Sequence, residues 1–384
     1  MELTLDQAVQ FMGRLFQQRE FATLARMAEE LTQQNPRIAI AWRYMGIAKI
    51  FTEGIGEQHL HQAALLDDEE ANLWLSVLSE CACYPKGKLV VDDIIAQVGF
   101  TRLRRSPYMD YPTEVTIETQ AVCNARCSFC PYDTMKRKGE RMSDALIDKI
   151  IDDLKAIPKD LSFTIAPFKV NEPFLDKRFI TVCEKINKEL HNAQLRIFTN
   201  GSTLTDDVID RVSGVRNVIH LWVSLNESEK ASYEAKIKLP FDKTIAKLDA
   251  LHKRADGGDF HQVIVSRVAD GSDADGKFRL FLKERYPLFD CVLLGREDWT
   301  GQVSSEEQRR VSSYGCYRWF EVSIMASGKV ALCCMDGEGK HVIGDVNNQS
   351  VLDIYNSPRY KKLRQYTNSR IAAVPPCDQC TYCL

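Results

Sequence analysis

The stretch Cys123-Asn124-Ala125-Arg126-Cys127-Ser128-Phe129-Cys130 directly follows a strand-like segment at 115–119. Its Cys-x-x-x-Cys-x-x-Cys spacing puts three thiolates on one loop, where they can bind three irons of a cubane cluster and leave the fourth iron without a protein ligand. A structural zinc site is the alternative, but zinc normally takes four ligands. The next candidates, Cys183 and His191, lie more than fifty residues further along the chain.

Outward from this loop, strand-like and helix-like segments alternate. Strands are predicted at 115–119, 161–165, 194–199, 218–225, 262–268 and 289–294. The first helix between them is capped by Ser143 and has one apolar face. This order predicts a parallel α/β sheet, doubly wound or a partial (βα)6 TIM-type barrel, and we favour the barrel. In both folds ligands bind at the carboxyl ends of the strands.

Four short polar motifs follow the later strands. They are Asn171-Glu172-Pro173, Thr199-Asn200-Gly201, Ser224-Leu225-Asn226 and Ser266-Arg267. Taken singly, each could be an ordinary turn. In this order behind the cysteine loop, they make residues 112–384 resemble the radical S-adenosylmethionine (SAM) enzymes. One position departs from the family pattern, because Asn171 stands where the Gly-Glu-Pro element of the family has Gly.

The resemblance implies that Cys123, Cys127 and Cys130 hold a 4Fe-4S cluster whose open iron is chelated by the methionine part of SAM. It implies that Phe129 lies against the adenine and that Glu172 binds the methionine amino group. Further cofactor contacts are expected from Asn171, Thr199, Asn200, Ser224, Asn226, Ser266 and Arg267. The implied chemistry is reductive cleavage of SAM to a 5′-deoxyadenosyl radical, which abstracts a substrate hydrogen.

A second group of cysteines lies near the end of the chain. Its spacing resembles the Cys-x(11)-Gly-x(4)-Cys opening and the Cys-x-x-Cys closing pair of SPASM and twitch modules, with Gly328 at the glycine position. The resemblance implies one auxiliary 4Fe-4S cluster, with the ligands Cys316, Cys333, Cys377 and Cys380. Cys334 and Cys383 are left unassigned, and a zinc ribbon is the alternative. A hairpin is predicted over 323–332, with its turn at Ser327-Gly328.

The first 85 residues contain only helix-like patterns. The segment that begins at Trp42, and a weaker copy 32 residues later at Trp74, resemble tetratricopeptide (TPR) repeats. The predicted domains are therefore TPR-like helices at 1–98, a radical SAM barrel at 110–310 and a small cysteine-rich domain at 311–384.

Composition limits the partners and the location. A net charge of -3 over 384 residues gives no basic field for nucleic acid. The amino terminus lacks the features of a signal peptide, and no apolar stretch reaches about 18 residues, so we predict a cytoplasmic protein with no membrane anchor. Thirteen unevenly spaced cysteines in a reducing compartment indicate metal binding rather than disulfides.

We therefore predict an oxidoreductase that acts on a small polar natural product, such as a sugar or an aminocyclitol. The alternatives are a radical SAM maturase or epimerase of a ribosomal peptide and, in another class, a zinc-stabilised protein-binding module. The electron donor is expected to be a flavodoxin or a ferredoxin. Cys291 and Cys334 are the predicted catalytic thiols, which would return a hydrogen atom to the substrate if the reaction is an epimerisation.

Overall fold

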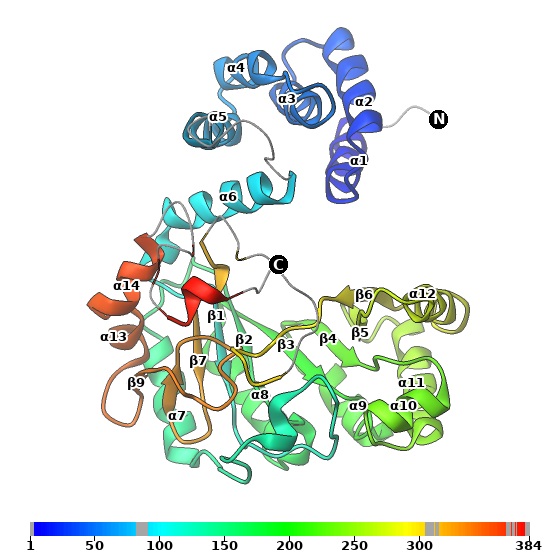
Figure 1. Cartoon of the computed structure of the whole chain (residues 1–384), viewed down its shortest axis with the longest axis vertical. Coiled ribbons are helices and arrows are strands. Elements are labelled where there is room, and N and C mark those ends of the chain that lie inside the picture. The colour runs from blue at the N-terminus through cyan, green and yellow to red at the C-terminus, as the bar shows by residue number, and fades with distance from the viewer. Residues whose placement is uncertain are drawn as a thin grey trace. The chain divides into compact units, whose positions relative to one another are not determined.

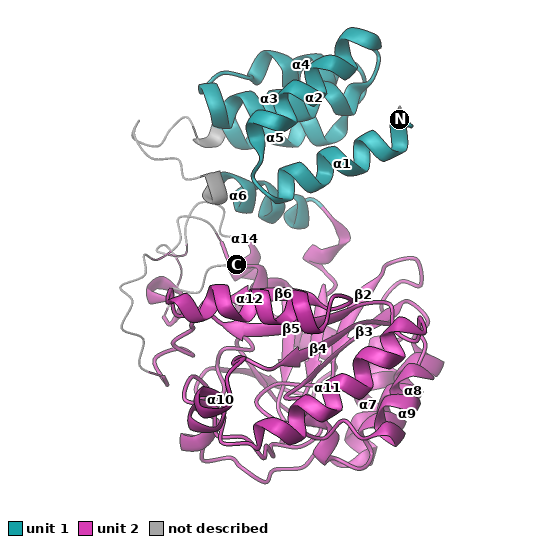
Figure 2. Ribbon diagram, turned by 90° about the vertical axis from the view of Figure 1, so that its right-hand side faces the viewer, with its two compact units in different colours: residues 1–105 teal, residues 106–384 magenta. Residues whose placement is uncertain are grey.

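The computed structural model describes residues 4–81, 91–303, 311, 315–365, 370, 373 and 375–380. The chain divides into two compact units, Met1–Arg105 and Ser106–Leu384 (Figure 2). Within the described ranges, no helix combines the length and the apolar composition that crossing a membrane requires.

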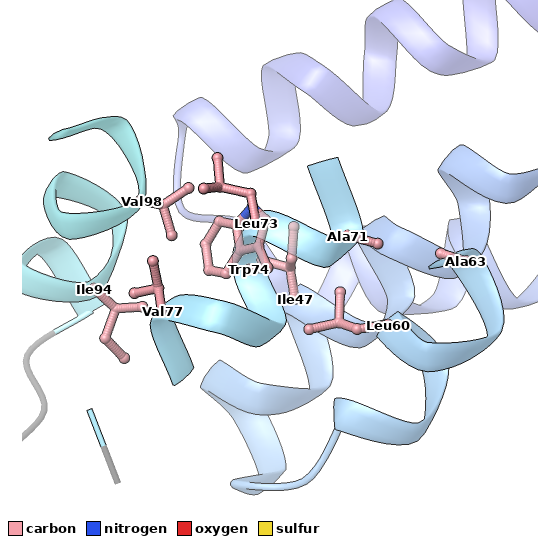
Figure 3. Close-up of a cluster of buried hydrophobic side chains, with 9 residues drawn as sticks. All are labelled: Ile47, Leu60, Ala63, Ala71, Leu73, Trp74, Val77, Ile94 and Val98. Atoms are coloured by element: carbon pink, nitrogen blue, oxygen red, sulfur yellow. The ribbon is translucent and has the colours of Figure 1, made fainter. Parts of the chain in front are cut away.

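The first unit is helical, as predicted. Its helices are α1 (Leu5–Gln17), α2 (Phe21–Gln34), α3 (Ala39–Glu53), α4 (Glu57–Leu65), α5 (Glu69–Cys81) and α6 (Val91–Arg104). Trp74 of α5 packs in a buried cluster with Ile47 of α3, Leu60 of α4 and Val98 of α6 (Figure 3). The likeness of these helices to TPR repeats stays a prediction.

The second unit is built on a nine-stranded sheet in the order β6-β5-β4-β3-β2-β1-β7-β8-β9 (Figure 1). Neighbouring strands from β6 to β1 are parallel, which confirms the predicted α/β architecture of a partial barrel. These strands are β1 (Glu114–Ile117), β2 (Phe163–Ala166), β3 (Ala193–Thr199), β4 (Val218–Ser224), β5 (Val263–Val268) and β6 (Asp290–Leu294).

Helices connect these strands and cover one face of the sheet (Figure 2). They are α7 (Asp144–Leu154), α8 (Phe179–Glu189), α9 (Asp206–Ser213), α10 (Lys230–Lys236), α11 (Phe241–Asp256) and α12 (Asp273–Arg285). Ser143 caps α7 as predicted, and its hydroxyl accepts from the Leu146 N–H. Strand side chains such as Ile165, Ile197 and Val223 are at most 1% exposed. Their burial is the main apolar contribution to the stability of this unit.

The cysteine-rich end of the chain continues the same sheet. Strand β7 (Glu321–Ile324) pairs in parallel with β1, and β8 (Lys329–Ala331) and β9 (Val342–Asp345) follow in antiparallel pairing. The predicted hairpin is confirmed, with Gly328 at a φ of 87° in its turn. Helices α13 (Val351–Tyr355) and α14 (Pro358–Gln365) complete the unit. The pairing of β7 with β1 was not expected, and the domain boundary at 311 stays a prediction.

Candidate active site

The cysteine loop follows β1 and is held in place by backbone hydrogen bonds to α10. The N–H of Arg126 donates to the Ile237 carbonyl at 3.1 Å, and the N–H of Ser128 donates to the Lys236 carbonyl at 3.0 Å. The N–H of Ala125 donates to Cys123 Sγ at 3.4 Å. These contacts fix the conformation of the loop independently of any bound group.

The three thiols of the loop are neighbours in a poorly solvated site. Burial raises the pKa of Cys123 to about 12 and that of Cys130 to about 11, and it also raises the pKa of Cys127. The charge of Cys130 adds to the shift at both other thiols, so the three act on one another. Three thiolates here need a strongly positive partner, and iron supplies that charge.

The donor set fits a cluster better than a single ion. Over the ranges that the structure describes, no three His, Cys, Asp or Glu side chains converge closely enough to share one metal ion. A cubane cluster does not need such convergence, because each thiolate binds a different iron. A structural zinc site, by contrast, brings four ligands to one ion.

Glu172 lies beside this loop, after β2. Its side chain is buried, and its carboxylate accepts from Thr199 Oγ1 at 2.8 Å, the Asn200 N–H at 2.7 Å and Thr203 Oγ1 at 3.0 Å. Burial raises the pKa of Glu172, and the charge of Glu172 adds to the pKa shift of Cys123. No Lys or Arg of the described residues pairs with this carboxylate, which leaves it suited to a ligand cation.

The neighbouring motif residues support this arrangement. Asn171 is buried, its Oδ1 accepts from the Lys169 N–H at 2.9 Å, and its Nδ2 has no hydrogen-bond partner among the described residues. Asn200 Nδ2 donates to Asn124 Oδ1 of the cysteine loop at 2.9 Å. The motifs after β2 and β3 therefore meet the cysteine loop, as predicted. Phe129 is partly buried, and its carbonyl accepts from Trp299 Nε1 at 3.1 Å.

The motifs after β4 and β5 form a second group. Asn226, at a φ of 68°, donates through Nδ2 to Ser224 Oγ at 2.8 Å and through its N–H to the Ser266 carbonyl at 2.9 Å. Arg267 is 1% exposed and pairs with Glu227 at 2.6 Å and with Asp275 of α12 at 2.7 Å. The structure thus engages Arg267 on the helix side of the sheet, where it holds the Asn226 turn. Its predicted cofactor contact remains a prediction.

The four predicted auxiliary ligands also lie near one another. Burial raises the pKa of Cys316 to about 12, and the charges of Cys380 and Cys377 add to that shift. The pKa of Cys333 is raised by burial and further by Cys334 and Cys316. Residues that are far apart in the sequence are therefore gathered at one place, as a cluster site requires. Cys383 lies outside the described residues.

Two N–H donors from nearby side chains point at these sulfurs. Trp319 Nε1 donates to Cys377 Sγ at 3.4 Å, and Arg370 Nη1 donates to Cys380 Sγ at 3.8 Å. Hydrogen bonds to ligand sulfurs stabilise the more negative, reduced state of an iron–sulfur cluster. The surroundings of this cysteine group therefore favour an electron acceptor.

The two predicted catalytic cysteines lie in different surroundings. Cys334 is near Arg318, Glu321 and Lys169, whose charges act on its raised pKa after the main effect of burial. Cys291 is exposed in β6, where it is in register with Val265 rather than with Ser266. Since strand side chains alternate between faces, Cys291 is on the sheet face opposite to Ser266. The structure does not bring Cys291 together with the other site residues.

The inner face of the sheet, which we define as the face opposite to helices α7–α12, carries charged side chains. Arg196 of β3 pairs with Glu114 of β1 at 2.6 Å, and its Nε donates to His220 Nδ1 of β4 at 3.2 Å. Strands β1 and β3 are not neighbours, so the first contact spans β2. Burial raises the pKa of Glu321 to about 7, which Arg318 opposes.

Aromatic rings lie on the same face. Phe198 stacks on Phe168 at 5.0 Å between ring centroids, and its centroid is 5.5 Å from that of Trp222. Trp222 Nε1 donates to Ser266 Oγ at 2.8 Å. Barrel interiors are usually filled with Val, Ile and Leu, so this polar and aromatic lining indicates a binding surface rather than a packed core.

Two buried ionic features were not predicted from the sequence. Glu118, after β1, forms a buried ion pair with Arg137, and the N–H groups of Val170 and Ala326 donate to its carboxylate at 3.2 Å. Lys169 is 2% exposed; burial lowers its pKa, and Cys334, Glu118 and Cys333 oppose that shift. Charged residues directly after two apolar strands were the available signal.

Comparison with known proteins agrees with this geometry. Residues 117–261 match the sequence model of the radical SAM superfamily, and residues 316–381 match that of the SPASM iron–sulfur cluster-binding domain. The chain belongs to the radical SAM enzymes that carry a SPASM domain. The first domain implies a 4Fe-4S cluster and SAM, the second implies auxiliary iron–sulfur binding, and enzymes of this kind need a reductant.

Solved structures share the fold at low identity. Streptococcus suis SuiB bound to precursor peptide SuiA is 13% identical over 86% of this chain and 83% of that chain, with a TM-score of 0.53. For anSMEcpe with bound AdoMet and Cp18Cys peptide, the values are 14%, 65%, 81% and 0.51. For BtrN in complex with AdoMet and 2-DOIA, they are 18%, 66%, 85% and 0.49. No curated protein matches the sequence significantly.

Proposed function

We propose that this enzyme oxidises a small polar substrate of the sugar or aminocyclitol kind. In this proposal Cys123, Cys127 and Cys130 bind the radical SAM cluster, and Glu172 binds the amino group of SAM. The ligands of a single auxiliary cluster are Cys316, Cys333, Cys377 and Cys380. Phe129 and the motif residues Asn171, Thr199, Asn200, Ser224, Asn226, Ser266 and Arg267 complete the cofactor site.

The observation that carries the substrate class is the lining of the inner face. The Phe168–Phe198–Trp222 row offers flat apolar surfaces to the C–H faces of a ring, while Arg196 and His220 offer polar groups beside it. Arg196 is already paired with Glu114, so the surface has no strong excess of one charge. A compact, polyhydroxylated or amino-substituted ring matches such a surface better than an anionic or purely apolar ligand.

The chain's own residues orient the substrate and exclude water from it. When bound, SAM and its cluster remove one hydrogen atom from the substrate, and the auxiliary cluster takes the second electron while a proton is released. A flavodoxin or a ferredoxin supplies the electron that SAM cleavage consumes. The N–H groups of Trp319 and Arg370 favour this direction of electron transfer, because they stabilise added negative charge at the sulfurs.

Epimerisation is the second candidate, and the position of Cys334 favours it. This thiol lies near Glu321 and Lys169, and Lys169 donates to Ser323 of β7, whose hydroxyl also accepts from Thr116 of β1 at 3.0 Å. A thiol in that neighbourhood could return a hydrogen atom to a substrate on the inner face.

Turnover in heavy water separates the two reactions. We expect sugars or aminocyclitols to be oxidised with one SAM consumed per product and no solvent deuterium at the reacting carbon. Deuterium at that carbon, lost in Cys334→Ala but kept in Cys291→Ala, would contradict oxidation and identify Cys334 as the donor. Turnover of peptides alone would contradict the substrate class. Product analysis by mass spectrometry and NMR gives each readout.

Iron content tests the assignment of ligands. The anaerobically reconstituted chain is expected to hold about eight irons, the content of two cubane clusters. The Cys123→Ala, Cys127→Ala, Cys130→Ala triple variant should keep about half of them, because the auxiliary ligands are independent of the loop. Iron and sulfide analysis measures both numbers. A triple variant without iron would refute the auxiliary site, and zinc in place of iron would support the zinc-stabilised alternative.

A further inference from the structure

Lys169 is a buried lysine that reaches from the radical SAM domain into the SPASM domain. It lies between β2 and the Asn171-Glu172 motif, and its side chain is 2% exposed. Its Nζ donates to Ser323 Oγ at 2.8 Å, to the Cys333 carbonyl at 3.2 Å and to the Cys334 carbonyl at 3.4 Å. Three acceptors match the three N–H groups of an ammonium ion.

This ammonium group has no carboxylate partner among the described residues. The nearest acidic side chain that acts on it, Glu118, is already paired with Arg137 and accepts two backbone N–H groups. Burying a lysine without a counter-charge is unfavourable, so its presence requires negative charge close by. The nearest other source of negative charge is the cysteine pair Cys333-Cys334.

A cubane cluster supplies the missing charge. Four thiolates around a cluster core of charge +2 leave a net charge of about -2, and one more negative charge after reduction. A fixed ammonium beside the ligand Cys333 stabilises the reduced state more than the oxidised state, because the attraction grows with the charge of the cluster. In a buried site this attraction is weakly screened by water and salt.

We propose that Lys169 raises the reduction potential of the auxiliary cluster and so makes that cluster the electron acceptor of the enzyme. This inference rests on the auxiliary ligand assignment in the proposed function. Lys169 acts as a positioning residue through its charge and its hydrogen bonds to the Cys333-Cys334 backbone. Its segment also carries Glu172, so one short loop serves both the SAM site and the auxiliary site.

The test is a redox titration of the auxiliary cluster, followed by EPR, in the full chain with the Cys123→Ala, Cys127→Ala, Cys130→Ala background. Lys169→Gln keeps N–H donors for the backbone carbonyls but removes the charge. We expect the ratio of oxidised to reduced cluster at a fixed potential to rise about tenfold, which is about 59 mV for a one-electron couple. Lys169→Arg should keep a potential close to that of the background chain.

Lys329→Met is the matched control, because Lys329 lies on β8 of the same hairpin but is exposed. Water screens its charge, so its removal should leave the potential unchanged. An unchanged potential in Lys169→Gln with full iron content would overturn the proposal. Loss of the auxiliary iron in that variant would also overturn it, since Lys169 would then have a merely structural role. A background chain that holds no iron would instead refute the ligand assignment itself.

Discussion

Replacing Cys123, Cys127 or Cys130 with Ala is expected to abolish SAM cleavage under dithionite. Each thiolate binds a different iron in the proposed site, so no remaining cysteine of the loop can substitute for the lost one. The loop is held by backbone hydrogen bonds to α10, which the substitutions leave in place. The measurement is 5′-deoxyadenosine formation under anaerobic conditions, compared with iron content for each variant.

Cys183→Ala is the matched control for these variants. Cys183 is fully buried on α8 among apolar residues and takes no part in the proposed site. Its loss should lower the free energy of unfolding by about 1 kcal/mol, the usual effect of a small cavity, and leave SAM cleavage intact. Full 5′-deoxyadenosine production by any of the three loop variants would contradict the assignment of the cluster ligands.

The sequence predicted the fold where the pattern was local. The cysteine loop, the six strands and the helix that begins after Ser143 depend on spacing and apolar periodicity, which a short segment contains in full. The meeting of Glu172 with Thr199 and Asn200 was also predictable, because carboxyl ends of parallel strands share one edge of a sheet. Strand ends differ from the predicted ones by only a few residues.

The sequence did not predict features that depend on distant pairing. Nothing in the short β7 segment specifies that it pairs with β1, about two hundred residues earlier. The buried position of Lys169 follows from that pairing, because Ser323 of β7 is one of its acceptors. The outward position of Cys291 depends on its register with β5, which composition cannot fix.

Glu172→Ala is expected to weaken SAM binding by about 10- to 100-fold while the radical SAM cluster stays in place. The reason is that Glu172 offers a buried carboxylate with no cation partner among the described residues, and a hydrogen bond to a charged group is worth about 1.5–3 kcal/mol. Equilibrium dialysis of the reconstituted protein measures the Kd for SAM, and iron analysis confirms the cluster. Glu184→Ala, an exposed position on α8, is the matched control and should keep the original Kd. Since Glu172→Ala also leaves the donors Thr199, Asn200 and Thr203 unpaired, Glu172→Gln provides a second variant of nearly the same shape. An unchanged Kd in both Glu172 variants would remove this residue from the SAM site, because a carboxylate that contacts the methionine amino group cannot lose its charge without weakening that contact.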